Sequence, residues 1–314
     1  MTSLPTLIDL VASEPHYRDH LLPIWNALPA ELRGIDWGGG PAERNGHVLM
    51  VAGYSDVKRH PHHPVVYVEH GAGQSYIDLD IAVRPFYSGG GQHRNVIGYV
   101  CPNDEVAGRW QSRYPDKPTA VVGCPRLDPW HAGDRGECDP RTVAITFHWD
   151  AQFTGVPETA SAFGYYLPHM VGIIERLRNK GWTILAHAHP RHTALANFWR
   201  QPEIKDLGAT FVESSDGVLD RAGVLIADNT SVQAEFLSLG RPVVWLNHPS
   251  YRRDVSHGGR FWQWPTLGGA QVDTGAELLA LDLSQLPPVT GHPYAYADGR
   301  ASQRAAQFVA ELVT

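Results

Sequence analysis

The turn at residues 228–231 carries the residue types best suited to chemistry in this sequence. It follows an apolar run at 223–227, which predicts a buried strand, and it precedes a helical pattern at 232–239. Backbone N–H groups and the helix dipole favour an anion at such a turn. Thr230 and Ser231 place two hydroxyls there, whereas an N-cap would use only one of them. We therefore expect this turn to bind a phosphate group.

Two carboxylates accompany these hydroxyls as candidate donor-binding residues. Asp228 opens the turn, where it is more typical of a strand end than of a catalytic acid. Glu235 lies about one turn into the predicted helix. Its carboxylate could hold the ribose hydroxyls of a nucleotide, or it could be an exposed surface charge.

A candidate general base, His70, directly follows the apolar run 64–69 and precedes Gly71. Ligands of parallel sheets bind at the carboxyl ends of the strands, so a histidine there is well placed to accept a proton. The glycine beside it opens the backbone to a ligand. The simpler alternative is a loop histidine that only ends the strand.

Three histidines surround Arg191 after a predicted strand at 182–187. Neutral imidazole is a common zinc ligand, but His187 and His189 would point to opposite faces of an extended segment. Phosphate binding by His189 and Arg191 fits the sequence better, because a guanidinium offers two donors to phosphate. We therefore expect no metal, although the spacing does not settle whether His187, His189 and His192 hold one.

Length and composition narrow the class of protein. The chain has 314 residues, enough for two domains, and its 43% apolar and 19% charged residues are typical of a soluble globular protein. No apolar run approaches the roughly 18 residues needed to span a bilayer, no secretory leader opens the sequence, and three cysteines without CxxC spacing argue against a disulfide framework. We expect a cytoplasmic protein, with peripheral attachment to a membrane left open. The net charge of −7 disfavours nucleic acid as a partner without excluding it.

Strands and helices alternate along both halves of the chain, which predicts an α/β fold with parallel sheets. The polar, aperiodic segment 131–141 is the predicted linker. We expect an N-terminal Rossmann-like acceptor-side domain at 1–130, a C-terminal nucleotide-donor domain at 142–300, and a last helix at 301–314 that could pack back on the first domain. The two sheets would face each other across a cleft. Long helices are expected at 7–28 and 160–180.

Together these pieces resemble the CDP-glycerol glycerophosphotransferase family, the teichoic-acid polymerase type with a GT-B fold. The matching pieces are His70-Gly71, His189-Pro190-Arg191 and the segment 227–247, ADNTSVQAEFLSLGRPVVWLN. That segment is similar to the family's Asp-Tyr-Ser-Ser turn, helix and Lys-Pro-Val strand, with Asn229 in place of the aromatic residue and Thr230 in place of the first serine. Residues 103–128 are similar to the helix and the Gly-x-Pro-Arg-x-Asp strand exit at the end of the family's first domain.

The resemblance implies a GT-B-like fold of two Rossmann-like domains and a transferase activity. Glycerol phosphate, or a sugar, would move from a nucleotide-diphosphate-activated donor such as CDP-glycerol to a hydroxyl of a polyol phosphate, a glycan or another acceptor. The resemblance implies that His70 deprotonates the acceptor and that His189, Thr230 and Ser231 hold the donor's pyrophosphate. No cofactor is expected, because the activated donor is itself a substrate.

Other functions remain open. A GT-B glycosyltransferase or a UDP-sugar 2-epimerase is one, because residues 67–75, YVEHGAGQS, are also similar to the epimerase's His-Val-Glu-Ala-Gly element. A non-catalytic nucleotide-binding protein that keeps the fold is another. A transferase acting on modified DNA bases is the last, and the acidic net charge disfavours it.

Overall fold

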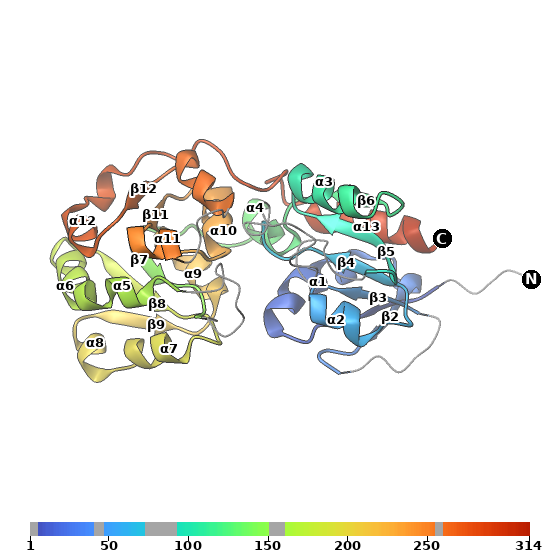
Figure 1. The fold of residues 1–314 in the computed structure, drawn as a ribbon, viewed down its shortest axis with the longest axis horizontal. Coiled ribbons are helices and arrows are strands. Elements are labelled where there is room, and N and C mark those ends of the chain that lie inside the picture. The colour runs from blue at the N-terminus through green and yellow to red at the C-terminus, as the bar shows by residue number, and fades with distance from the viewer. Residues whose placement is uncertain (1–5, 41–46, 73–92, 151–160, 255–259) are drawn as a thin grey trace, which may run out of the picture. The chain divides into compact units, whose positions relative to one another are not determined.

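A computed structural model describes the chain in five stretches, residues 6–40, 47–72, 93–150, 161–254 and 260–314 (Figure 1). They form two compact units, Met1–Asp134 together with Tyr294–Thr314, and Arg135–Pro293. Each unit contains one six-stranded sheet, and every pairing among the described strands is parallel. The predicted α/β fold with two parallel sheets is therefore confirmed.

The first unit is built on a sheet with the strand order β2-β1-β3-β4-β5-β6. Three of its strands, β1, β3 and β4, consist entirely of buried residues, as expected of a parallel sheet that is covered on both faces. The strands are β1 (Ile8–Leu10), β2 (Arg33–Asp36), β3 (Val48–Val51), β4 (Val65–Val68), β5 (Val96–Cys101) and β6 (Thr119–Val121). The helices are α1 (Pro15–Ala27), η1 (Ala30–Leu32), α2 (Tyr54–Arg59), α3 (Asp104–Arg113), η2 (Pro125–Leu127), α4 (Asp128–His131) and α13 (Ala301–Val313).

The helix predicted at 7–28 is wrong in its first part, because Ile8–Leu10 forms β1 between β2 and β3. Asp9 is fully buried in this strand, and its carboxylate accepts a hydrogen bond from Trp37 Nε1 at 2.8 Å. The helix α1 begins only at Pro15, which suits a first helical turn because it has no N–H to leave unpaired. A largely apolar run of three residues before a helix is compatible with either a strand or a helix, so periodicity alone could not distinguish the two.

The second unit is built on a sheet with the strand order β12-β11-β10-β7-β8-β9. The strands are β7 (Asp139–Thr146), β8 (Thr183–His187), β9 (Ala209–Val212), β10 (Ala222–Ala227), β11 (Val243–Leu246) and β12 (Ala270–Val272). The helices are α5 (Phe163–Tyr166), η5 (Leu167–His169), α6 (Met170–Asn179), α7 (Thr193–Trp199), α8 (Pro202–Asp206), α9 (Ser215–Arg221), α10 (Val232–Ser238), α11 (Pro249–Asp254), η6 (Arg260–Leu267), α12 (Gly275–Ala280) and η7 (Leu283–Gln285). No helix in the described stretches of either unit combines the length and apolar character needed to cross a membrane.

Two segments of this unit differ from the sequence-based expectation. The strand β7 begins at Asp139, inside the segment 131–141 that we predicted as a linker, because Asp139 pairs with Ala222 of β10. The single helix predicted at 160–180 is divided into α5, η5 and α6 in its described part. Pro168 lies at the division, where it cannot donate the backbone hydrogen bond that a continuous helix requires.

The last helix, α13, is held to the first unit by a capping interaction over a long sequence distance. Its own N-cap residue, Arg300, makes no side-chain cap. The carboxylate of Asp128 instead accepts hydrogen bonds from the backbone N–H groups of Ala301 at 2.9 Å and Ser302 at 2.7 Å. A carboxylate at this position satisfies unpaired helix donors and also complements the positive end of the helix dipole.

Replacing Asp128 with alanine should therefore loosen α13. Loss of a cap costs about 2 kcal/mol, so the amides of α13 should exchange with solvent about 30-fold faster. Hydrogen-exchange mass spectrometry of peptides covering α13 measures this directly. The exposed residue Gln303 on the same helix provides the control, since Gln303→Ala should leave exchange unchanged. Unchanged protection in Asp128→Ala would show that the cap is not a support of the helix.

Candidate functional site

Parallel pairing in the second unit places the carboxyl ends of its strands at one edge of the sheet. The register aligns Ala227 at the end of β10 with Thr146 at the end of β7. It also aligns β7 with β8 on the other side. The loops that leave β7, β8 and β10 therefore start side by side. This carboxyl edge of the second sheet brings the predicted residues of 189–191 and 228–231 to one side of the unit.

Asp228 is held by more hydrogen bonds than its neighbours at this edge. It is 1% exposed, and its carboxylate accepts hydrogen bonds from the backbone N–H of His148 at 2.6 Å, the backbone N–H of Ala162 at 2.7 Å and the hydroxyl of Ser161 at 3.3 Å. Burial raises the pKa of Asp228 to about 7, although the three hydrogen bonds favour the charged form. Asp228 thus ties the loop after β7 to the segment that precedes α5.

The two hydroxyls of the turn are not used by the fold. Ser231 occupies the N-cap position of α10, but its side chain makes no capping hydrogen bond. The hydroxyl of Thr230 likewise has no hydrogen-bond partner within the described stretches. Neither residue therefore forms the side-chain cap that the sequence predicts. Within the described stretches, both hydroxyls therefore lie at the carboxyl edge without a capping role.

The helix that follows the turn is buried along its whole length. Glu235 is 1% exposed, so the alternative of an exposed surface charge is wrong. Gln233 is also 1% exposed, and its Nε2 donates to the carbonyl oxygen of Ala227 at 3.3 Å. This hydrogen bond joins the first turn of α10 to the end of β10 and limits how far the turn between them can move.

His189 and Arg191 lie together after β8, as the sequence predicts, and a tryptophan that sequence reasoning did not select lies with them. The ring of Trp149 stacks on that of His189, with centroids 5.8 Å apart. The guanidinium of Arg191 lies 5.0 Å from the centre of the same indole ring. The position of Trp149 just beyond a strand was the available signal, because polar and aromatic residues after parallel strands face the ligand edge.

A backbone hydrogen bond determines which nitrogen of neutral His189 carries the proton. The N–H of Arg191 donates to Nδ1 of His189 at 3.1 Å, so Nδ1 carries a lone pair. The neutral ring then bears its proton on Nε2, which makes Nε2 a hydrogen-bond donor. This geometry suits a phosphate oxygen, which can only accept.

The other two histidines of this cluster have separate partners. Nδ1 of His187 is 2.9 Å from Oγ1 of Thr146. Nδ1 of His192 accepts from the N–H of Leu195 at 3.3 Å and so caps α7. Within the described residues, no group of three or more histidine, cysteine, aspartate or glutamate side chains is arranged to hold a metal ion.

The first unit carries the remaining candidates, His70 and Gly71, at the carboxyl end of β4. Nδ1 of His70 lies 2.8 Å from the carbonyl oxygen of Ala52, which follows β3. Gly71 has a φ of 75°, a conformation that residues with a Cβ adopt at a cost. Asn103 holds the next residue of the loop, because its Nδ2 donates to the carbonyl oxygen of Ala72 at 3.2 Å.

Aromatic residues of α1 surround His70, and the sequence did not single them out. The ring centroid of Tyr17 is 4.7 Å from that of His70, and those of His16 and His20 are 6.1 and 6.4 Å away. The neighbouring carboxylate of Glu69 is occupied elsewhere, since it accepts from Trp110 Nε1 at 3.0 Å. Burial lowers the pKa of His70, and Glu69 partly offsets this effect.

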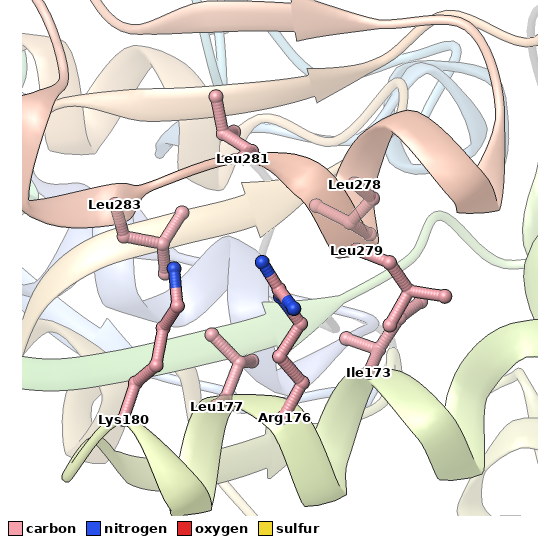
Figure 2. A pocket seen from close by; sticks show the side chains of 8 residues that line it. All are labelled: Ile173, Arg176, Leu177, Lys180, Leu278, Leu279, Leu281 and Leu283. Carbon is pink, nitrogen blue, oxygen red and sulfur yellow. The ribbon is translucent and has the colours of Figure 1, made fainter.

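A separate concave region of the second unit lies between α6 and the chain around α12. Figure 2 shows leucine side chains from both segments pointing toward one another, with Arg176 of α6 and Lys180, which follows that helix, beside them. None of the predicted site residues lines this region. We interpret it as part of the packing between α6 and α12.

Replacing Asp228 with asparagine should remove a pH dependence from the stability of the second unit. The pKa of Asp228 rises from its ordinary 3.8 to about 7 on folding, so the folded chain retains this proton more strongly. The corresponding stabilisation is present below about pH 4 and is lost as the pH rises toward about 7. The full loss is about 4 kcal/mol, at about 1.4 kcal/mol per pKa unit.

The measurement is the free energy of unfolding of the wild type and of Asp228→Asn between about pH 4 and about pH 8. The wild type should lose stability relative to the variant across this window. Asp206→Asn, at an exposed position of α8, is the matched control and should follow the wild type. If the difference in the free energy of unfolding between wild type and variant does not change with pH, the raised pKa of Asp228 is wrong.

Comparisons with known proteins establish the fold. No family model and no curated protein matches the sequence. A structure of the wall teichoic acid polymerase TagF aligns with a TM-score of 0.65 at 13% identity, covering 98% of this chain and 88% of that one. The S. aureus MnaA–UDP co-structure aligns with a TM-score of 0.59 at 14% identity, covering 95% and 94%. The UDP-GlcNAc 2-epimerase of Methanocaldococcus jannaschii in complex with UDP-GlcNAc and UDP gives 0.58 at 13%, covering 97% and 99%. This chain therefore has a GT-B-like fold.

Proposed function

We propose that this chain is a transferase that moves glycerol phosphate, or a sugar, from a nucleotide-diphosphate-activated donor to an acceptor hydroxyl. His70 is the general base, and His189, Arg191, Thr230 and Ser231 hold the phosphates of the donor. The observation that carries this proposal is that the backbone holds His70 and His189 in opposite tautomers.

The hydrogen bond to Ala52 prepares His70 for proton abstraction. A carbonyl oxygen can only accept, so the contact at 2.8 Å places the proton of the neutral ring on Nδ1. Nε2 keeps its lone pair and has no hydrogen-bond partner within the described stretches. Burial lowers the pKa of His70, which keeps the ring neutral near pH 7. A neutral imidazole with an available Nε2 is what a general base requires.

The opposite arrangement at His189 supports a binding role. Its Nε2–H is a donor, and Arg191 beside it adds positive charge and further N–H donors. The hydroxyls of Thr230 and Ser231, which have no hydrogen-bond partner among the described residues, complete a set of donors for phosphate oxygens. Asp228 supports this set by fixing the turn.

With CDP-glycerol as the donor, the acceptor oxygen attacks the phosphorus that carries glycerol. A bond forms between that oxygen and phosphorus, the bond from phosphorus to the bridging oxygen breaks, and CMP leaves with the electron pair. The proton of the acceptor hydroxyl passes to Nε2 of His70. His189 and Arg191 offset the negative charge that develops on the leaving group. With a sugar donor, attack occurs at the anomeric carbon and a nucleoside diphosphate leaves.

The remaining candidates have supporting roles in this proposal. Gly71 lets a substrate approach the backbone beside the base, because no Cβ covers it. The buried carboxylate of Glu235 binds the ribose of the donor. The donor is a substrate, so the reaction requires no further cofactor, and no metal is assigned to the site.

A UDP-sugar 2-epimerase is the second candidate function. The solved structures that share this fold include the UDP-GlcNAc 2-epimerase of M. jannaschii and the MnaA–UDP co-structure, and their fold similarity supports this alternative as well. An epimerase converts its nucleotide sugar without a second substrate. Release of nucleotide that depends on an added acceptor therefore favours the transferase.

Glutamine substitutions should separate the two histidine roles. Glutamine supplies an N–H donor but cannot accept a proton, so His189→Gln should retain activity within about tenfold of the wild type. His70→Gln should be as inactive as His70→Ala, about 10²–10⁴-fold below the wild type, since this is the usual contribution of a general base. The turnover of a nucleotide-activated donor and acceptor pair is measured in each variant. His62→Ala, at an exposed position, should be fully active.

Two outcomes would contradict these roles. Turnover that survives in His70→Ala would remove His70 as the base. Equal losses in His189→Gln and His189→Ala would show that more than an N–H donor is needed at His189.

Removing both hydroxyls of the turn should weaken donor binding. A thermal-shift screen of CDP-glycerol, CDP-ribitol, UDP sugars and GDP sugars identifies the donor, because a ligand at a hundredfold excess over its Kd stabilises the fold by about 2.7 kcal/mol. The double variant Thr230→Ala, Ser231→Ala should bind that nucleotide about 10²–10⁴-fold more weakly, since hydrogen bonds to charged groups contribute about 1.5–3 kcal/mol each. Thr210→Ala, at an exposed position of β9, is the control. An unchanged affinity in the double variant would place the phosphates elsewhere.

A further inference from the structure

The chain that leaves β7 carries a tryptophan in contact with both polar side chains that follow β8. Trp149 is half-buried and lies just beyond the end of β7. Its ring stacks on that of His189 at an interplanar angle of 23°, and the guanidinium of Arg191 lies 5.0 Å from its centre. Each contact is weak by itself, but both are made by one indole. The ring therefore joins two side chains that Pro190 separates in the sequence.

The main chain beside the indole is held in place from the turn at 228–231. The N–H of His148 donates to the buried carboxylate of Asp228 at 2.6 Å. Nδ1 of His148 lies 2.8 Å from the carbonyl oxygen of Trp149, so the neutral ring of His148 donates to the residue that carries the indole. Trp149 is thus connected through its backbone to the residue that opens the turn, and through its ring to His189.

Packing of the core does not explain this tryptophan. Trp199 and Trp245 are core residues of the same unit, with 0% and 1% of their surface exposed. Among the described residues, the large apolar core cluster of the second unit does not include Trp149. The indole instead stays half-buried at the carboxyl edge, where its printed ring contacts are with histidines and an arginine.

Contacts of this kind reduce the entropy that phosphate binding must otherwise overcome. Arg191 is exposed, and a guanidinium on an exposed loop samples several rotamers, of which binding selects one. A cation–aromatic contact restricts those rotamers before a ligand arrives. Stacking restricts the His189 ring in the same way, and with it the directions in which Nε2–H can donate.

We infer that Trp149 is a positioning residue for the proposed reaction. Its indole holds the neutral ring of His189 and the guanidinium of Arg191 ready for the same pair of phosphates, and its backbone keeps both in a fixed relation to the turn at 228–231. The role rests on the proposed function for the identity of the ligand, a nucleoside diphosphate group. Binding of the phosphates can nevertheless be measured without an acceptor and without turnover.

The test is calorimetry of the variants with inorganic pyrophosphate, CDP and UDP as probes. Trp149→Leu keeps an apolar side chain but removes the ring, and it should bind about tenfold more weakly, as expected for the loss of one stack and one cation–aromatic contact. Trp149→Phe keeps a ring and should bind within about threefold of the wild type. Phe211→Leu is the matched control, since Phe211 is a half-buried aromatic residue 4.7 Å from the guanidinium of Arg200, and it should bind like the wild type.

A double-mutant cycle tests whether the indole acts through His189. His189→Ala removes the ring on which Trp149 stacks, so the double variant His189→Ala, Trp149→Leu should lose clearly less affinity than the product of the two single losses. Losses that multiply would refute the positioning role. The same conclusion follows if Trp149→Leu binds like the wild type, if Trp149→Phe binds no better than Trp149→Leu, or if Phe211→Leu binds as weakly as Trp149→Leu.

This result is separable from those for the proposed function. Probe binding that depends on Trp149, together with full turnover in His70→Ala, would keep the positioning role and refute the proposed base. Weaker binding in His189→Ala with unchanged binding in Trp149→Leu would keep the phosphate site and refute the role of Trp149 alone. A wild type that binds none of the probes would refute the phosphate site and the role of Trp149 with it.

Discussion

The parallel pairing of β10 with β7 is the constraint on which the carboxyl edge of the second sheet depends. Because Ala227 at the end of β10 is in register with Thr146, the residue that follows the strand, Asp228, lies beside the chain that leaves β7. The 2.6 Å hydrogen bond from the N–H of His148 follows from that register. Burying a carboxylate is costly unless several donors form hydrogen bonds with it. The loop after β7 and the segment before α5 are therefore held to Asp228, and the turn at 228–231 is held with them.

Main-chain groups, more than residue types, determine what the histidines can do. His70 and His189 each follow a strand, but a carbonyl oxygen meets Nδ1 in the first and an N–H meets it in the second. The first ring can accept a proton from a substrate, and the second can only donate a hydrogen bond while it is neutral. The same reasoning removes His192 as a base, because its Nδ1 is used in capping α7.

The features predicted best from the sequence are those determined by residues close together in the chain. The strand before His70 and the strand before Asp228 could both be read from neighbouring residues. Contacts between distant residues could not be read, such as the Asp128 carboxylate at the start of α13. The burial of Glu235 was also hidden, since a charged residue in a helical pattern normally predicts an exposed face.

The fold alone does not choose between the two kinds of enzyme that share it. A choice requires a feature that only one of the two reactions needs. An epimerase rearranges one nucleotide sugar, whose diphosphate is already provided with donors by His189, Arg191 and the hydroxyl turn under our proposal. A transferase must in addition hold an acceptor hydroxyl beside its base, which under our proposal is Nε2 of His70, so dependence on an added acceptor, rather than the fold, separates the two reactions.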